Sequence, residues 1–312
     1  MSTIEFPNQP HLYIYNRHHQ RYNTPDLEPL SFYFFGSGST GNSVYLKESH
    51  VLIDLGFPYK RYIDTIPMFW YDCRYVFLTH EHSDHLNPST LIRLLDLYPH
   101  LRFLISQRMF RVITQPAFAH RFNANEERGR ERQAELLGKY HNRFHLLNAD
   151  DKGLRLPTPN GTIIVNPYFV SHENIINVAY QIDTPEHHLI YTSDLDHVFT
   201  SANDPNRELS LPMEYSTDGH PMMMQHPFDL MFVEANYDRD ILEEALREDP
   251  ENAHARGNLR HISEQETWQY IQYTLAPHGL FIPLHASSAF GTLVQDLEPE
   301  KPEPTTNPKE ES

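Results

Sequence analysis

Short runs of apolar residues, separated by polar turns, recur along most of the chain, and runs of this length are typical of buried β-strands. In the first half of the sequence they lie at residues 31–35, 42–46, 51–55 and 75–79. In the second half they lie at residues 162–165, 168–170, 178–182, 188–192, 230–233 and 280–284. Both halves of the chain therefore predict sheet structure.

Helical patterns occur between and after these runs. Leucine and isoleucine recur at helical spacing from residue 91 to residue 97, just after Pro88 and Ser89, which mark a plausible helix start. We predict a charged surface helix at residues 123–140 and two further helices at residues 238–247 and 263–275. Strands followed by helices in both halves favour an α/β fold in which two sheets pack together with helices outside.

The two ends of the chain depart from this pattern. Residues 1–28 are rich in Pro, Tyr, Asn and His without clear periodicity, and we interpret them as an N-terminal extension that packs over the domain or stays partly loose. Residues 298–312 contain prolines, glutamates and lysines but no apolar face, which predicts a disordered acidic tail. One domain is left at residues 29–297.

Composition narrows the class of protein. Hydrophobic residues make up 39% of the 312, and no apolar run approaches the roughly 20 residues of a membrane helix, so we expect no membrane partner. The start has neither a basic nor an apolar leader segment, so we expect no secretory signal. Cys73 is the only cysteine, which excludes an internal disulfide and a thiolate metal site. A cytoplasmic location is the simplest expectation.

The net charge of −17 argues against a surface that coats nucleic acid. It leaves room for a nuclease, because bound divalent metals and a local basic strip can receive phosphates.

Residues 80–85, His-Glu-His-Ser-Asp-His, follow the apolar run at 75–79 directly. The chain has 21 histidines, so spacing has to carry the interpretation. Alternate side chains of an extended segment share a face, so His80, His82 and Asp84 can converge, with His85 turning as the helix begins. Imidazole and carboxylate together suit zinc, manganese or iron. A histidine-rich surface loop is the alternative, which the position after a strand disfavours.

Two metal ions need more ligands than this stretch supplies. His172, Asp194 and His285 each follow a strand-like run. One such residue would more often be structural, but three in order point to a shared site.

This set of residues resembles the metallo-β-lactamase superfamily over about residues 31–294. The resemblance implies a four-layer αβ/βα sandwich of two mixed sheets with a two-metal site between them. It assigns His80, His82 and His172 to the first metal ion, and Asp84, His85 and His285 to the second. Asp194 would bridge both, and Asp54 would orient a ligand histidine from behind.

Further stretches indicate which branch of the superfamily the chain resembles. Asp194 stands where true β-lactamases have cysteine, and His82 where the diiron redox branch has glutamate. The segments FGSGSTGNSVYL, FVEANYDRDIL and RHISEQET followed by LHAS resemble the WalJ/YycJ-type exonucleases. The glycine-rich segment by itself would be read as an ordinary hairpin turn. Tyr237 and Glu264 depart from that group, which commonly has histidine and asparagine there.

His261 precedes a predicted capping box in which Ser263 is the N-cap and Glu266 lies three residues on. A helix N-terminus favours an anion such as phosphate. We therefore take His261 as a candidate general acid or phosphate clamp, with a structural loop histidine as the alternative.

These inferences predict a hydrolase that uses two divalent ions, zinc or manganese. A hydroxide shared by the two ions would attack phosphorus, with Asp84, Asp194 and His261 as the catalytic residues. The favoured substrate is nucleic acid, with a DNA exonuclease preferred. A phosphodiesterase for small cyclic nucleotides and a carboxylic ester or thioester hydrolase of the same fold are the alternatives.

Candidate substrate contacts are weaker. They are Arg128, Arg130, Arg132, Ser263 and Asn236. The arginines alternate with glutamates, so a solvated helix with ion pairs is the stronger interpretation of that segment. Many relatives of this fold dimerise, so a homodimer is a further expectation, although no sequence feature marks an interface.

Overall fold

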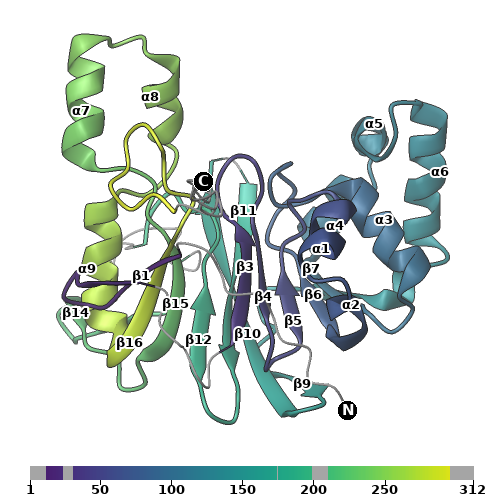
Figure 1. The fold of residues 1–312 in the computed structure, drawn as a ribbon, viewed down its shortest axis with the longest axis horizontal. Helices are drawn as coiled ribbons and strands as arrows, with labels where there is room; N and C mark the ends of the chain where they lie inside the picture. Colours follow the sequence, from purple (N-terminus) through teal and green to yellow (C-terminus); the bar gives the residue numbers. More distant parts are fainter. Residues whose placement is uncertain (1–11, 24–30, 174, 199–209, 296–312) are drawn as a thin grey trace, which may run out of the picture.

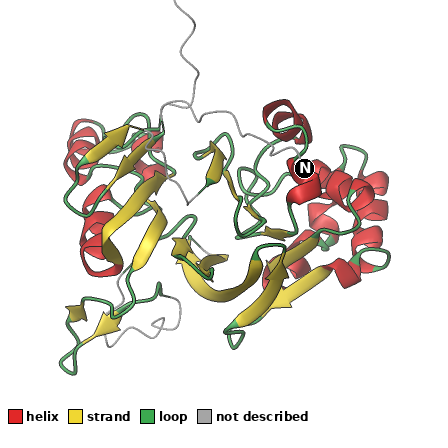
Figure 2. Ribbon diagram, turned by 60° about the horizontal axis from the view of Figure 1, so that its bottom comes forward, coloured by secondary structure: helices red, strands yellow, loops and turns green. Residues whose placement is uncertain are grey.

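Two β-sheets face each other across the middle of the molecule, and helices cover the outer side of each (Figures 1 and 2). The computed structural model describes residues 12–23, 31–173, 175–198 and 210–295. No helix in these ranges combines the length and apolar character needed to cross a membrane.

The first sheet has six strands in the order β3-β4-β5-β6-β7-β8. They are β3 (Phe32–Gly36), β4 (Ser43–Leu46), β5 (Val51–Ile53), β6 (Tyr75–Phe77), β7 (Arg102–Ser106) and β8 (Phe144–Leu147). The pairs β3–β4 and β4–β5 are antiparallel, and the pairs from β5 to β8 are parallel. The sheet is therefore mixed.

The second sheet has eight strands in the order β2-β1-β16-β15-β12-β11-β10-β9. They are β1 (Tyr13–Tyr15), β2 (Arg21–Asn23), β9 (Leu154–Thr158), β10 (Gly161–His172), β11 (Ile175–Asp183), β12 (His188–Tyr191), β15 (Phe228–Glu234) and β16 (Leu275–Leu284). Only β12–β15 and β15–β16 pair in parallel. A separate hairpin joins β13 (Glu214–Tyr215) to β14 (Pro221–Met222).

The helices divide between the two sheets (Figure 1). Beside the first sheet lie α1 (Tyr59–Thr65), α2 (Phe69–Asp72), α3 (Pro88–Leu97), α4 (Gln107–Ile113), α5 (Ala119–Phe122) and α6 (Glu126–Leu137), with 3-10 turns at Pro116–Phe118 and His141–Arg143. Beside the second lie α7 (Arg239–Glu248), α8 (Ala253–Asn258) and α9 (Glu264–Thr274).

The strands carry apolar side chains on both faces, which explains why they read as continuous runs. Phe77 of β6 and Phe232 of β15 belong to the core between the sheets, where Phe77 packs against Tyr180 with ring centroids 4.9 Å apart. Val76, the neighbour of Phe77, belongs to the core under α1–α3 instead. Because adjacent residues serve different layers, one-sided alternation is absent from these strands.

Several elements differ from the sequence prediction. The runs at 162–165 and 168–170 are one strand, β10, because Asn166 and Pro167 continue the pairing with β11. Part of the expected N-terminal extension belongs to the second sheet, since β1 pairs with β16 and buries Leu12 and Ile14. Residues 1–11, 24–30 and 298–312 lie outside the described residues, so the extension boundary at 28 and the tail stay predictions.

Candidate metal centre

The residues of the proposed centre gather where strands of both sheets end. His172 and Glu234 are the last residues of β10 and β15, and four further residues follow a strand directly or within three residues. These other residues are Asp54 after β5, His80 after β6, Asp194 after β12 and His285 after β16. The core holds each strand in place, so the sandwich itself brings these distant positions together.

All seven predicted ligands fall into two groups whose ligand atoms lie within 4.8 Å of one another. The first group is His80, His82, His172 and Asp194, and the second is Asp84, His85, Asp194 and His285. The grouping matches the assignment implied by the resemblance, and Asp194 belongs to both groups.

Asp194 is the centre of the arrangement. Its Oδ2 lies 3.6 Å from His172 Nε2 and 3.8 Å from His80 Nε2, while its Oδ1 lies 3.2 Å from His85 Nε2. Burial alone would raise the pKa of this carboxyl group. The surrounding histidines, His285 and His85 foremost, outweigh burial and hold the pKa of Asp194 well below its usual range.

The residues present fit divalent metal ions. His80 Nε2 is buried without a hydrogen-bond partner among the described residues, which is costly unless a ligand binds there. Burial and the neighbouring His85 lower the pKa of His80, and burial lowers the pKa of His172 to about 4. These two imidazoles of the first group are therefore neutral near pH 7, as metal ligands must be. In the second group burial would lower the pKa of His285, but Asp194 and Asp84 outweigh burial and raise the pKa of His285 to about 9, so a metal ion would have to displace a proton there. The donors are all nitrogen and oxygen, which suits zinc or manganese.

Asp54 lies behind the second group, where the resemblance placed it. It is fully buried, and its Oδ2 accepts a hydrogen bond from His85 Nδ1 at 2.8 Å. Its Oδ1 accepts from Thr79 N at 3.0 Å and Thr79 Oγ1 at 2.9 Å. The His85 ring is thereby oriented with Nε2 toward Asp194.

The glycine-rich segment does more than turn the chain. Asn42 N donates to Asp84 O at 2.7 Å, and Asn42 Nδ2 lies 2.9 Å from His85 Nε2. Ser37 Oγ accepts a hydrogen bond from His285 N at 2.7 Å. Gly56 packs so tightly against the loop that an added Cβ would lie 1.8 Å from Asp84 O. Sequence reasoning marked the glycines but missed Ser37, Asn42 and Gly56.

Backbone strain concentrates at the centre. Six described non-glycine residues have a positive φ, and four of them lie at these strand ends. They are Asp54 (60°), Glu173 (54°), Ser193 (59°) and His285 (53°). Such conformations cost free energy and persist where surrounding packing imposes them, commonly at functional sites.

His261 lies at the edge of the second group, beside a residue that sequence reasoning left unassigned. Its Nδ1 is 2.5 Å from Oε1 of Glu234, which is fully buried, and its ring stacks on His285 with centroids 4.8 Å apart. Burial disfavours the imidazolium, but the charge and hydrogen bond of Glu234 outweigh burial and raise the pKa of His261. Glu234 lies in the FVEAN segment, so its position at a strand end was the available signal.

The predicted capping box is half formed. Ser263 caps α9 by accepting a hydrogen bond from Glu266 N at 3.2 Å. The Glu266 carboxylate does not complete the reciprocal bond predicted for it, because it accepts from Val198 N at 3.0 Å instead. Ser263 is buried, and its hydroxyl also accepts from Arg239 Nη2 at 3.1 Å. Ser263 therefore serves as the helix cap, and substrate contact through it stays a prediction.

The candidate arginines lie on α6, at the outer edge of the helices beside the first sheet (Figure 1). Arg130 pairs with Glu126 at 2.5 Å and Arg132 with Glu135 at 2.7 Å. These pairs agree with the alternative interpretation of a solvated, ion-paired helix. Arg128 is exposed on the same helix. Asn236, by contrast, lies at the centre, where its Nδ2 donates to His285 O at 2.7 Å.

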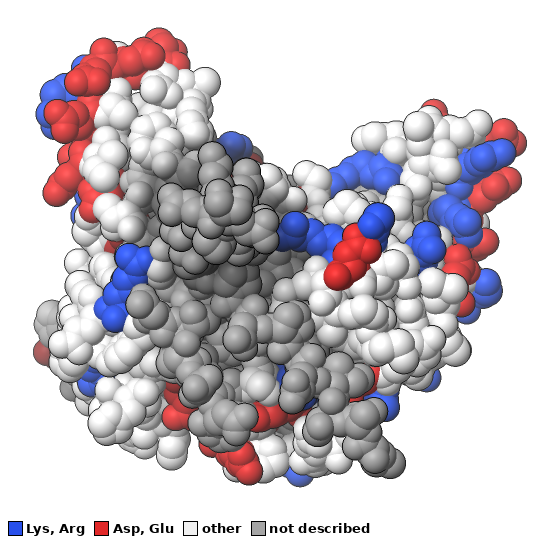
Figure 3. Space-filling view, in the orientation of Figure 1, with Lys and Arg blue, Asp and Glu red and all other residues white. Residues whose placement is uncertain are grey.

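Another arginine, Arg121 of α5, contacts the loop of residues 80–85. Its Nη1 donates to Glu81 O at 2.8 Å, and Arg108 Nη1 pairs with the Glu81 carboxylate at 3.1 Å. Figure 3 shows a notch between the α7–α8 helices and the α5–α6 helices, with Lys and Arg side chains on the α5–α6 side. Glu81 therefore anchors the loop to α4 and α5 through these two arginines.

Comparisons with known proteins bear on the fold. No family model and no curated protein matches the chain. Human tRNase Z, short form, is similar in structure with 14% identity and a TM-score of 0.50 over 86% of this chain and 97% of that one. A diphosphatase from the PhnP family has 13% identity and a TM-score of 0.47 over 83% and 87%. The metallo-β-lactamase fold protein YhfI from Bacillus subtilis has 14% identity and a TM-score of 0.41 over 67% and 72%.

At these identities the likeness concerns the fold alone. Two mixed sheets packed face to face between helices are the arrangement that the sequence predicted. The prediction is confirmed: this chain has the metallo-β-lactamase fold.

Proposed function

We propose that the protein is a metal-dependent phosphodiesterase that hydrolyses nucleic acid, with a DNA exonuclease as the favoured case. The observation that carries the proposal is the pair of nitrogen- and oxygen-donor groups that share Asp194, with the His261–Glu234 pair at their edge. The likeness in fold to a structure described as a tRNase supports the same class of substrate.

His80, His82 and His172 would hold one divalent ion, and Asp84, His85 and His285 the other, with Asp194 contacting both. Ions bound there would withdraw charge from phosphoryl oxygens and lower the pKa of a water molecule toward neutrality. Asp54 and Asn42 keep the second group in position through their contacts with His85 and Asp84. Zinc or manganese is the metal in this proposal.

His261 supplies the proton in this proposal. Its Nδ1 is committed to Glu234, so Nε2 is the nitrogen left to meet a substrate. An imidazole held in this way can give a proton to the leaving oxygen or donate a hydrogen bond to a phosphate oxygen. Asn236 holds the neighbouring His285 backbone, which keeps the stacked pair of rings together.

A phosphodiesterase for cyclic nucleotides is the second candidate, and the net charge of −17 favours it, because a small substrate needs no long basic track. The carboxylic ester or thioester hydrolase is the third. A cytoplasmic location and a homodimer stay predictions, the latter open to sedimentation measurements.

A substrate panel tests the proposal. Zinc- or manganese-loaded protein is incubated with end-labelled single- and double-stranded DNA, RNA, cyclic nucleotides and a thioester. We expect release of nucleotides from DNA. Cleavage of cyclic nucleotides with DNA left intact would favour the second candidate, and thioester cleavage alone the third.

Paired variants connect any activity to the centre. Asp84→Ala and His261→Ala should each abolish most of the activity. The matched controls are Asp218→Ala and His220→Ala, whose side chains are 70% and 80% exposed in the hairpin between β13 and β14. Full activity in Asp84→Ala would contradict the metal centre, and full activity in His261→Ala would remove its catalytic role.

A further inference from the structure

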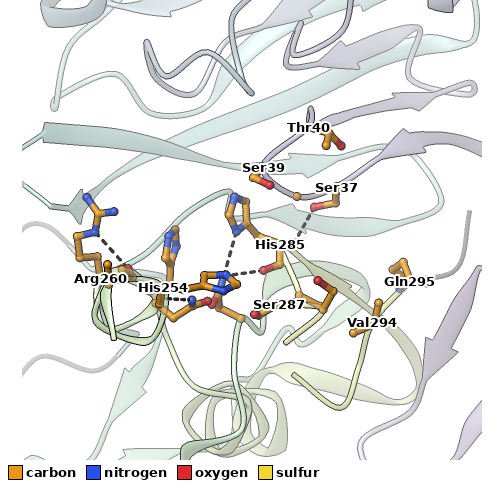
Figure 4. Close-up of a pocket in the computed structure, with 17 residues that line it drawn as sticks. Ser37, Ser39, Thr40, His254, Arg260, His285, Ser287, Val294 and Gln295 are labelled. Carbon is orange, nitrogen blue, oxygen red and sulfur yellow. Dashed lines mark hydrogen bonds between the residues drawn. The ribbon is translucent and has the colours of Figure 1, made fainter. Parts of the chain in front are cut away.

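A cavity of about 520 Å³ opens beside the metal centre (Figure 4). His261, His285 and Asn236 form the part of its wall that belongs to the centre. The remaining wall comes from the Ser37–Thr40 loop, from α8 and the residues after it, and from residues 286–288 and 294–295. This volume is within the range of about 300–1,000 Å³ usual for small-ligand sites.

We propose that this cavity binds a second phosphate group of the substrate, next to the phosphodiester that is cleaved, through Arg260. The inference rests on the proposed phosphodiesterase function and deepens it. It names the substrate class as a nucleotide unit that carries phosphate on both sides.

The charge of the lining supports an anionic ligand. The whole chain has 42 acidic and 25 basic residues, yet none of the 17 described residues that line the cavity is acidic. The lining supplies one arginine, three histidines and several hydroxyl groups, all of which can donate hydrogen bonds. The described lining itself therefore carries no carboxylate to repel a phosphate, and Glu173 and Glu234 reach it only as partners of Arg260 and His261.

Arg260 is placed to bind that phosphate. Its Nε donates to Gly257 O at 3.1 Å, and its Nη1 pairs with Glu173 Oε1 at 2.7 Å. The Arg260 side chain is 56% exposed, and an ion pair this exposed contributes little free energy. Exchanging Glu173 for a phosphate therefore costs little, and a guanidinium binds phosphate through two parallel hydrogen bonds.

The position of Arg260 also connects binding to chemistry. It immediately precedes His261 in the chain, so their Cα atoms are only about 3.8 Å apart. In Figure 4 Arg260 stands on one side of the view, Val294 and Gln295 on the other, and His285 between them. A ligand that fills the cavity would reach Arg260 while its reacting phosphate lies near His285.

Calorimetry on the full-length, metal-loaded protein tests this inference. The probes are a nucleoside 3′,5′-bisphosphate and the matching 3′- and 5′-monophosphates. We expect the bisphosphate to bind about tenfold more tightly than either monophosphate, since one charge-assisted contact is worth roughly this factor. In Arg260→Gln this preference should disappear, and in Arg260→Lys it should survive in part.

Arg256→Gln is the matched control. Like Arg260, Arg256 is an exposed arginine that pairs with a glutamate, Glu251, at 2.8 Å, but it lies within α8 and does not line the cavity. This variant should keep the full preference. Equal binding of all three probes by the unchanged protein, or a preference that persists in Arg260→Gln, would overturn the inference.

Hydrolysis of bis(p-nitrophenyl) phosphate, a diester without a second phosphate, separates the two claims. Hydrolysis of this compound combined with no preference for the bisphosphate would refute the second-phosphate site alone. No hydrolysis of any diester would refute the proposed function, and the calorimetric preference would then show whether the cavity still binds a second phosphate.

Discussion

The loop from His80 to His85 supplies four of the seven proposed ligands within six positions, whereas His172, Asp194 and His285 come one each from separate strands of the eight-stranded sheet. Residues 80–85 lie between β6 and α3 and belong to no strand. It is held from outside by Asn42 and Leu55, whose backbone amides donate to Asp84 O at 2.7 Å and His85 O at 2.8 Å. Neighbouring loops therefore set its position.

The strand-end ligands are held differently. His172 is still paired with Ile175 in the β10–β11 hairpin, and the ladder between β15 and β16 continues to Leu284, the residue before His285. Sheet pairing therefore fixes the backbone at His172 and up to the residue before His285. We therefore expect substitutions at supporting residues to disturb the positions of the loop ligands more than those of the strand-end ligands.

Gly56→Ala should have the largest effect, because it attacks the support of the loop. The new Cβ would lie 1.8 Å from Asp84 O and 2.5 Å from Asn42 N, both backbone atoms that cannot move without the loop. We expect the free energy of unfolding to fall by about 3 kcal/mol, with loss of bound metal and of activity. Chemical denaturation and metal analysis measure both.

Gly257→Ala is the control for this substitution. A Cβ there would lie 3.7 Å from the end of the flexible Arg260 side chain, and the residue is inside α8. We expect unchanged or slightly higher stability, since alanine favours a helix by up to about 1 kcal/mol. Equal destabilisation by both variants would contradict the special role of the close contact at Gly56.

Asp194→Asn should show how the loss of a ligand shared by both groups differs from the loss of a ligand in one group. Because Asp194 contacts both groups, we expect loss of both metal ions and a fall in kcat of roughly a thousandfold. His172→Ala, which alters only the first group, should lose one ion. Metal analysis after exhaustive dialysis compares the two variants. Retention of one full equivalent of metal by Asp194→Asn would show that the groups are independent.

The ligands of the His80–His85 loop could be predicted from the sequence because they lie close together in the chain. Four proposed ligands in six positions after an apolar run form a local pattern, and spacing alone identifies His80, His82 and Asp84 as a candidate site. His172, Asp194 and His285 are each unremarkable in their local sequence. Only their order along the chain, compared with a known family, assigned them to the same centre.

Other features depend on tertiary contacts that no local pattern encodes. Gly56 looks like an ordinary glycine after a strand, and its importance arises from Asp84, which is 28 residues away in the chain. In the sequence Glu234 is only a charged residue at the end of a strand, and its pairing with His261 becomes visible in the structure. β7, β8 and β9 were missed although β7 is fully buried after its first residue. Strand runs this short cannot be separated from loop sequence without their partners.

Two buried carboxylates extend the comparison, since each one orients a histidine through Nδ1. On the strand-end side, Glu234→Gln should lower kcat by about a hundredfold. Glu234 accepts from His261 and from Leu195 N, the latter at 2.5 Å, and glutamine has only one acceptor oxygen for the two donors. Metal content should stay unchanged, because Glu234 is hydrogen-bonded to His261 and belongs to neither of the two groups that share Asp194. A matching loss of metal would instead make it a structural part of the centre.

On the loop side, Asp54→Asn should have the smallest effect of the four, a roughly 10- to 100-fold loss of metal affinity. Asparagine tolerates the positive φ of 60° at this position, so the backbone is left in place. Its oxygen can still accept from Thr79, but its amide would then face His85 Nδ1 as a donor. The His85 proton would move to Nε2, the nitrogen that points toward Asp194. A metal ion must displace that proton, so excess metal should restore most of the activity in Asp54→Asn but none in Glu234→Gln. Titration of activity against metal concentration makes this comparison, and failure of excess metal to rescue Asp54→Asn would show that Asp54 acts on something other than the ligand histidine.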